Sequence, residues 1–67
     1  MSEIRFHWRA QIAFNVLPEY VRNMIRLELE NRSSLSPLGR QSFLVRGFSV
    51  SYESFNRSSA LYVLEIR

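Results

Sequence analysis

Cysteine does not occur among the 67 residues, so the chain can form neither a disulfide nor a thiolate metal site. Histidine occurs once, at His7, and a single imidazole cannot complete a zinc site of paired histidines. Aspartate is also missing, which leaves a Ser-His-Asp triad without its third member. The two glycines, Gly39 and Gly47, fit no phosphate-binding loop or dinucleotide fingerprint. We therefore expect no metal and no cofactor.

Long apolar runs are missing as well. No stretch approaches the roughly 20 residues that a membrane-spanning helix needs. No charged segment precedes an apolar one at the start of the chain, as it does in a secretory signal. The sequence therefore predicts a cytoplasmic protein without a membrane partner.

Lysine is absent too. All nine cationic residues are arginine and all six acidic residues are glutamate, which gives a net charge of +3 and a pI near 10.2. The guanidinium group pairs with phosphate and carboxylate through two parallel hydrogen bonds and stacks on bases, so this composition is compatible with RNA, DNA or an acidic protein as partner. A charge of this size serves solubility equally well, so composition alone leaves binding and solvation as alternatives.

Chain length bounds the architecture. A chain of 67 residues has room for one hydrophobic core, and we expect a single domain over residues 1–67. Domains of this size bury only about 60% of the surface that the unfolded chain exposes, so their stability margin is small. Without a disulfide or a metal, the expected support is burial against a partner, either another protein or a second copy of the chain.

The first segment, residues 3–15, carries a pattern with two interpretations. Apolar residues alternate with polar ones as in a strand: Ile4, Phe6, Trp8, Ala10, Ile12 and Phe14. Helical spacing at i, i+3, i+4 and i+7 is also present: Ala10, Ala13, Phe14 and Leu17. The pattern predicts a strand through about Trp8, and it leaves residues 9–17 open between strand and helix.

The next segment predicts a helix from about Pro18 to Arg32. Proline fits the first helical position, and Glu19 in the first turn favours the positive end of the helix dipole. One side of this helix is apolar: Leu17, Val21, Met24, Ile25 and Leu29. Residues 33–41 are predicted to form a loop, because Pro37 and the surrounding serines stop a helix.

Two further alternating runs predict strands over residues 42–54 and 60–66. In the first run, one face carries Leu44, Arg46, Phe48, Val50 and Tyr52. Gly47 within this run indicates a bulge or a close backbone approach. A polar turn around residues 56–59 joins the two strands into an antiparallel hairpin. The expected fold class is α+β, with a small antiparallel sheet and a C-terminal β-hairpin packed against one or two N-terminal helices.

Arginine and aromatic residues interleave in the C-terminal half. The arginines are Arg40, Arg46, Arg57 and Arg67, and the aromatics are Phe43, Phe48, Tyr52, Phe55 and Tyr62. Arginines can neutralise phosphates while an aromatic ring stacks on a base, so this pattern indicates a nucleic-acid-binding surface. Aromatic residues in alternating strands are also ordinary core or cross-strand partners, which is the alternative interpretation.

Three stretches of the sequence resemble parts of one family. Residues 4–8, Ile-Arg-Phe-His-Trp, look like a first strand, and residues 17–22, Leu-Pro-Glu-Tyr-Val-Arg, look like the entry into a second helix. Residues 37–40, Pro-Leu-Gly-Arg, and the strands that follow look like a C-terminal sheet. Together these stretches resemble the RelE/ParE toxin superfamily of bacterial toxin-antitoxin systems over nearly the whole chain.

The resemblance implies a function and a set of residues. In RelE-like members, basic residues on the sheet bind messenger RNA in the ribosome and promote cleavage through the ribose 2′-hydroxyl, whereas ParE-like members target DNA gyrase. It therefore implies a toxin-like domain that acts on RNA, the ribosome or gyrase and is neutralised by an antitoxin. Carried over by position, the charge-stabilising candidates are Arg40, Arg46 and Arg67, and Tyr52 is a stacking candidate.

Two departures from the family bear on catalysis. Ser49 stands where ribosome-dependent members commonly place an arginine, and the family's catalytic lysines have no counterpart in a chain without lysine. An attenuated or gyrase-directed member therefore fits the sequence as well as a nuclease does, and whether the chain is an enzyme stays open.

A second hypothesis is a non-catalytic homodimeric module that binds a protein or a nucleic acid. In this hypothesis the first strand continues to about Phe14 and joins the hairpin in a βαββ sheet, one face of which is completed by dimerisation. A helix over residues 9–17 favours the toxin-like order of elements instead.

Overall fold

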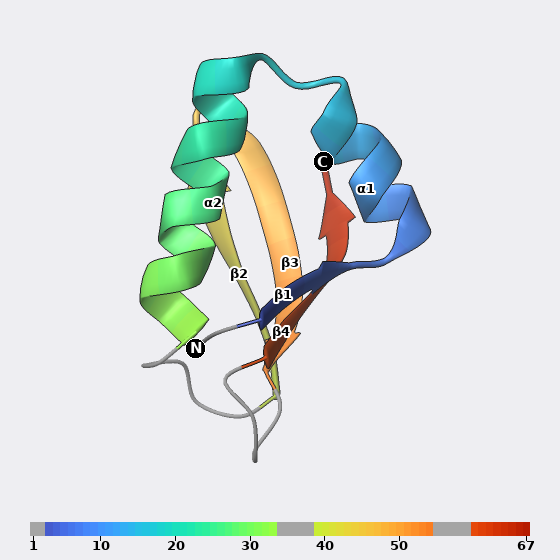
Figure 1. Ribbon diagram of the computed structural model, residues 1–67, viewed down its shortest axis with the longest axis vertical. Helices are drawn as coiled ribbons and strands as arrows, with labels where there is room; N and C mark the ends of the chain where they lie inside the picture. Colours follow the sequence, from blue (N-terminus) through green and yellow to red (C-terminus); the bar gives the residue numbers. More distant parts are fainter. Residues whose placement is uncertain (1–2, 34–38, 55–59) are drawn as a thin grey trace.

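The structure, a computed structural model, describes residues 3–33, 39–54 and 60–67. Its elements, in chain order, are β1 (Glu3–Phe6), α1 (Trp8–Asn15), α2 (Glu19–Ser33), β2 (Gly39–Val45), β3 (Phe48–Ser54) and β4 (Ala60–Ile66). Figure 1 shows both helices connected at one end of the molecule, with α2 lying along the sheet. The α+β class predicted from the sequence is confirmed.

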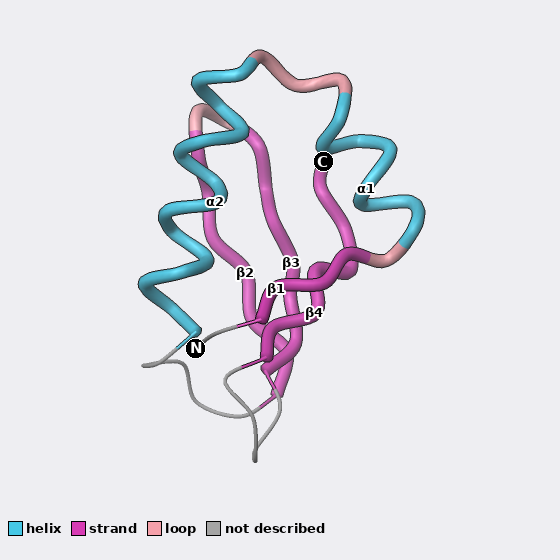
Figure 2. Tube along the Cα trace, viewed as in Figure 1, coloured by secondary structure: helices cyan, strands magenta, loops and turns pink. Residues whose placement is uncertain are grey.

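The sheet is mixed rather than antiparallel. Its strand order is β1-β4-β3-β2, with antiparallel pairs between β2, β3 and β4. The first strand pairs with β4 in parallel, for example Ile4 with Leu61. Parallel neighbours need a long crossover, and here α1, α2, β2 and β3 all lie between them in the chain (Figure 2). The antiparallel hairpin of β3 and β4 is as expected, whereas the parallel edge strand was not predicted.

The segment that had two interpretations is a helix, α1. Ala10 and Phe14 are buried while Ile12 between them is exposed, which is the four-residue period of a helix and not the two-residue period of a strand. His7 ends the extended segment as the N-cap, and its Nδ1 accepts a hydrogen bond from the backbone N–H of Arg9 at 3.2 Å. The prediction of a strand through Trp8 was therefore two residues too long.

The second helix matches the expected bounds to within one residue at each end. Val21, Ile25 and Leu29 are buried on the side that faces the sheet, as the periodicity predicts. Met24 differs, because 41% of it is exposed. No helix in the described part of the chain is long and apolar enough to cross a membrane.

The run predicted as one strand over residues 42–54 is a two-stranded hairpin. Val45 pairs with Phe48, so Arg46 and Gly47 are the two central residues of the turn, with φ of 52° and 84°. Positive φ at both positions is the signature of a type I′ turn, whose twist suits adjacent antiparallel strands. Gly47 therefore marks a turn and not a bulge.

The turn also reverses the alternation. The buried side chains are Phe43 and Val45 before the turn but Val50 and Tyr52 after it. The prediction that Leu44 and Val50 share a face was therefore wrong. The strand before the turn begins at Gly39, within the stretch 33–41 that was predicted to be a loop. The predicted turn at residues 56–59 lies outside the described residues.

The packing of α2 gives a testable prediction. Ile25 has no exposed surface, so Ile25→Ala is expected to lower the free energy of unfolding by about 2–5 kcal/mol, because it removes buried apolar atoms and leaves a cavity. The matched control is Leu27→Ala on the same helix, where 61% of the side chain is exposed and the expected change is within about 0.5 kcal/mol. Urea denaturation followed by circular dichroism measures both, and equal losses would contradict this orientation of α2.

Candidate functional site

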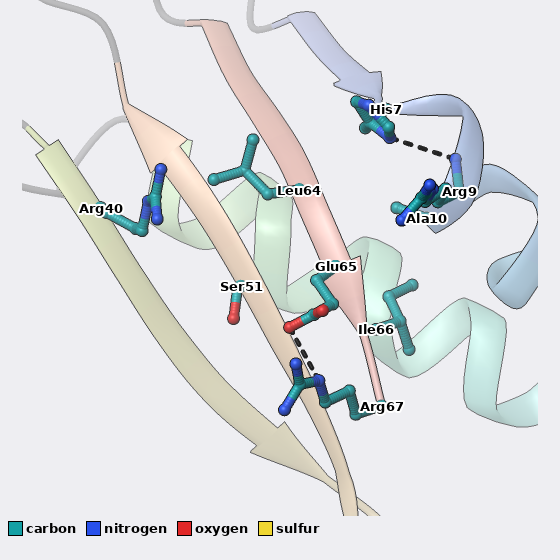
Figure 3. Close-up of a pocket in the computed structure, with 9 residues that line it drawn as sticks. All are labelled: His7, Arg9, Ala10, Arg40, Ser51, Leu64, Glu65, Ile66 and Arg67. Carbon is teal, nitrogen blue, oxygen red and sulfur yellow. Dashed lines mark hydrogen bonds and ion pairs between the residues drawn. The ribbon is translucent and has the colours of Figure 1, made fainter.

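A pocket of about 540 Å³ lies on the sheet at the N-terminal end of α1. Within the described residues, both helices pack into one core with one face of the sheet, and no helix covers the opposite face, from which Figure 3 views the pocket. The residues that line it are His7, Arg9, Ala10, Arg40, Ser51, Leu64, Glu65, Ile66 and Arg67. With three arginines against one glutamate, the lining is cationic.

A β-bulge in β4 determines which side chains of this strand reach the pocket. Ser51 pairs with Glu65 and Tyr52 pairs with Val63, so Leu64 has no partner of its own in the ladder. An extra residue shifts the alternation by one position. Val63 and Ile66 consequently both face the core, while Glu65 and the following Arg67 remain exposed.

Arg67 is fixed to the neighbouring strand although it follows the last residue of β4. Its backbone N–H donates to the carbonyl oxygen of Ser49 at 2.9 Å, and its own carbonyl oxygen accepts from the N–H of Ser49 at 2.8 Å. The guanidinium Nε lies 2.9 Å from Oε1 of Glu65. Because the Arg67 side chain is 77% exposed, this ion pair is worth little in stability and leaves most of the guanidinium surface accessible.

His7 and Arg9 enter the pocket from the junction of β1 and α1. The backbone N–H of His7 donates to the carbonyl oxygen of Val63 at 2.8 Å, which holds the junction against β4. Because Nδ1 of His7 accepts from the N–H of Arg9, the proton of the neutral imidazole lies on Nε2. Neutral His7 can therefore donate a hydrogen bond through Nε2, which suits an anion better than a cation.

Arg40 reaches the pocket from β2, on the far side of β3. It stands opposite Glu53 in the antiparallel register and its side chain is exposed. The pocket thus draws its cations from three separate parts of the chain: Arg40 from β2, Arg67 from the end of β4 and Arg9 from α1. The first residues of α1 add the partial positive charge of a helix N-terminus. Such an arrangement can hold a phosphate or another multivalent anion.

Of the four candidate residues from the sequence, the structure brings together Arg40 and Arg67. Arg46 lies elsewhere, at the β2–β3 turn, with its guanidinium carbon 5.8 Å from the centre of the Tyr20 ring. The arginine of the wider pattern, Arg57, lies outside the described residues.

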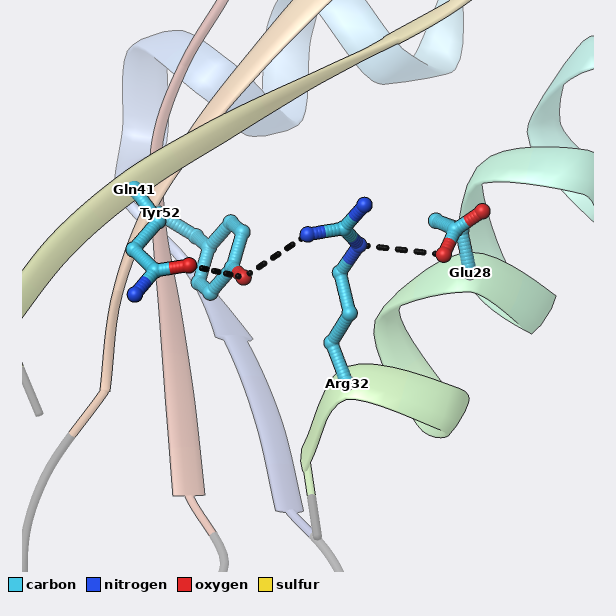
Figure 4. A network of polar contacts seen from close by, with 4 residues as sticks. All are labelled: Glu28, Arg32, Gln41 and Tyr52. Carbon is cyan, nitrogen blue, oxygen red and sulfur yellow. Dashed lines mark hydrogen bonds and ion pairs between the residues drawn. The ribbon is translucent and has the colours of Figure 1, made fainter. Parts of the chain in front are cut away.

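Tyr52, the stacking candidate, belongs to the core. It has no exposed surface, and its hydroxyl lies between two side chains (Figure 4). Nη1 of Arg32 donates to this hydroxyl at 3.4 Å, and the hydroxyl donates to Oε1 of Gln41 at 3.4 Å. The enclosed ring therefore has no face free for a base, and the expectation of a surface stacking group is corrected to a core residue that connects α2 with the sheet.

Arg32 completes this connection between α2 and the sheet. Its Nε pairs with Oε2 of Glu28 at 3.0 Å, and its guanidinium carbon lies 4.8 Å from the centre of the Phe43 ring. The hydrogen bond to Tyr52 raises the pKa of Arg32 above its ordinary value, burial opposes this rise, and the pair with Glu28 adds to it. The group stays charged at physiological pH and acts in structure rather than in the pocket.

Three titratable lining residues were not among the sequence candidates: His7, Arg9 and Glu65. His7 and Arg9 lay in a segment whose pattern predicted a strand as readily as a helix, so no signal placed them at a helix start. Glu65 reaches the pocket only because of the bulge at Leu64, which depends on pairing with another strand. Among the described residues, no group of three or more histidine, aspartate or glutamate side chains gathers to hold a metal ion.

These features define a small α+β domain with two helices packed on a four-stranded mixed sheet and a cationic pocket at the start of the first helix. Among solved structures, the chain is similar to the isolated Escherichia coli RelE toxin, with a TM-score of 0.81 and 15% identity over 96% of this chain and 80% of that chain. It is also similar to a chain of the intact E. coli RelBE toxin-antitoxin complex, with a TM-score of 0.79 and 15% identity over 96% and 92%. The chain therefore has the RelE toxin fold, as its sequence pattern implied. No protein-family model matches the sequence, and no curated protein matches it.

The pocket predicts selective anion binding. Arg40→Ala and Arg67→Ala are each expected to weaken binding of tripolyphosphate roughly tenfold or more, because each removes a charge-assisted hydrogen bond. Arg46→Ala removes the same charge from the turn and is expected to leave the affinity nearly unchanged. Isothermal titration calorimetry at low salt makes the comparison, and an equal loss in all three variants would show that net charge alone binds the anion.

Proposed function

We propose that the chain is a toxin-like domain that acts on RNA and is neutralised by a protein antitoxin. The observation that carries the proposal is the cationic pocket on a domain with the RelE toxin fold. RNA supplies the matching charge, because every nucleotide of its backbone carries a phosphate. The pocket also lies where no helix covers the sheet in the described part of the chain, so a strand of RNA can approach it.

The pocket holds groups for phosphoryl transfer as well as for binding. In the cleavage that the family resemblance implies, the ribose 2′-hydroxyl loses its proton and its oxygen attacks the adjacent phosphorus. The bond from phosphorus to the 5′-oxygen then breaks, and that oxygen takes up a proton from solvent. Glu65 is the lining carboxylate that can accept the 2′-hydroxyl proton, and Arg40 and Arg67 can neutralise the additional charge on the phosphate.

His7 has a different role in this proposal. Its capping hydrogen bond to Arg9 keeps the proton of the neutral ring on Nε2, so Nε2 cannot serve as the base. The imidazole instead donates a hydrogen bond to a phosphate oxygen. This assignment leaves Glu65, whose Oε1 pairs with Nε of Arg67, as the base.

A protein antitoxin fits the surface of the second helix. Tyr20, Met24 and Leu27 recur at i, i+4 and i+7, and all three are exposed on the side of α2 away from the core. Large apolar side chains in such a row are typical of the contact with a partner helix. The similar chain of the intact E. coli RelBE complex comes from a toxin-antitoxin assembly, which supports a protein partner of the same type for this chain.

Induced expression in a bacterial host tests the proposal. The wild-type chain is expected to arrest growth, and Arg40→Ala/Arg67→Ala is expected to relieve the arrest because it removes the phosphate-binding charges. Glu65→Gln is expected to relieve it as well if the RNA is cleaved, since the amide cannot accept the proton. Arg46→Ala, which keeps the pocket intact, is expected to remain toxic.

Two measurements on the same cultures distinguish RNA from DNA gyrase as the target. Primer extension on cellular messenger RNA detects cleavage, and gel analysis of plasmid topology detects inhibition of DNA gyrase. Growth arrest with altered plasmid supercoiling and intact RNA would contradict the RNA proposal. Normal growth with abundant soluble wild-type protein would contradict a toxic activity in that host.

A further inference from the structure

We propose that Trp8 is a stacking platform for an unpaired base of the nucleic acid whose phosphate occupies the pocket. This inference rests on the proposed function, and it adds a second subsite beside the pocket. The two residues on either side of Trp8 in the chain, His7 and Arg9, both line the pocket, whereas Trp8 lies just outside it.

Trp8 is unusually exposed to solvent for so large a side chain. At the first position of α1, 62% of its surface is exposed, although a tryptophan in a small domain is normally one of the largest contributors to the core. The buried positions of this helix are Ala10 and Phe14, so the indole points away from the core. Its packing therefore gives no structural reason for a tryptophan at this position.

Contacts connect the indole ring with the pocket. The guanidinium carbon of Arg9 lies 5.1 Å from the centre of the indole, and the imidazole of His7 lies 5.8 Å from it at an interplanar angle of 31°. His7 also contacts the edge of the Tyr62 ring, with 6.4 Å between the centroids. These contacts place the indole beside two residues that line the anion site.

An indole beside an anion pocket offers room for one nucleotide, because the phosphate can lie in the pocket while the base attached to it stacks on the ring. Every base has a π-face, so stacking on an indole is tolerant of sequence but requires that the base be unpaired. The pair of Arg9 and Trp8 therefore favours single strands over duplexes.

The exposed surface of α1 offers an alternative reading. Ile12 and Val16 follow Trp8 at intervals of four residues and are also exposed, so the three could form an apolar row for a protein partner. The contacts with His7 and Arg9 distinguish Trp8 from the other two, because they link it alone to the pocket. Substitution of Ile12 therefore serves as the matched control.

The test uses the purified chain and the fact that Trp8 is its single tryptophan, so intrinsic fluorescence reports on this side chain only. An eight-nucleotide single-stranded oligoribonucleotide is expected to quench the fluorescence, because the base stacks on the indole. Tripolyphosphate, which has no base, is expected to bind in the pocket with little quenching. Trp8→Ala is expected to weaken RNA binding about 5- to 150-fold, measured by fluorescence anisotropy of labelled RNA.

Four outcomes separate the inference from the proposed function. Weaker RNA binding by Trp8→Ala with unchanged tripolyphosphate binding supports the inference, provided that Ile12→Ala binds as the wild type does. Unchanged RNA binding by Trp8→Ala, while Arg40→Ala/Arg67→Ala loses it, overturns the inference and leaves the proposed function standing. Unchanged binding by all variants overturns both. Equal losses for Trp8→Ala and Ile12→Ala overturn the base platform in favour of an apolar contact row.

Discussion

In β4 the pairing with β3 passes over Leu64, and this one unpaired residue reverses the direction of every side chain that follows it in the strand. In a regular strand after Val63, alternation would turn Glu65 and Arg67 toward the core and Ile66 toward solvent. The bulge instead lets Ile66 complete the core while two charged residues join the pocket. The core and the site therefore depend on the same irregularity in the ladder.

The pocket also depends on how α1 begins. The backbone of His7 is hydrogen-bonded to β4, and its ring caps α1. His7 thereby places Arg9 at the same pocket as Arg40 and Arg67. None of these cations is buried, so the desolvation cost of gathering them is small. Their mutual repulsion still favours an anion between them, which is how a domain with a thin stability margin can maintain a charged site.

Much of the fold was predictable because it follows from local patterns. The helix over residues 18–32 and the strand over residues 60–66 follow from patterns along the chain, and the structure confirms both elements to within one residue at each end. The bulge at Leu64 and the parallel pairing of β1 depend on contacts between separate segments. The type I′ turn is local, but its Arg46-Gly47 pair lacks the asparagine or aspartate that most often marks such a turn. The apolar periodicity of a sequence does not reveal which segments pair with one another. Both the turn and the bulge also shift the alternation by one position.

The candidate site was predictable only in part, because it too depends on which strands pair. Composition and the family resemblance pointed to arginines of the C-terminal half, but only strand pairing decides that Arg40 and Arg67 line the same pocket while Arg46 stays at a turn. The sequence pattern of Tyr52 fits a core residue as well as a surface stacking group, and its complete burial shows that it is a core residue.

The central claim is that single-stranded RNA binds across this pocket. Mapping of amide chemical-shift changes by NMR during titration with an oligoribonucleotide tests this claim most directly. The account predicts the largest changes at Arg9, Arg40 and Arg67, whereas changes confined to the outer face of α2 would contradict it.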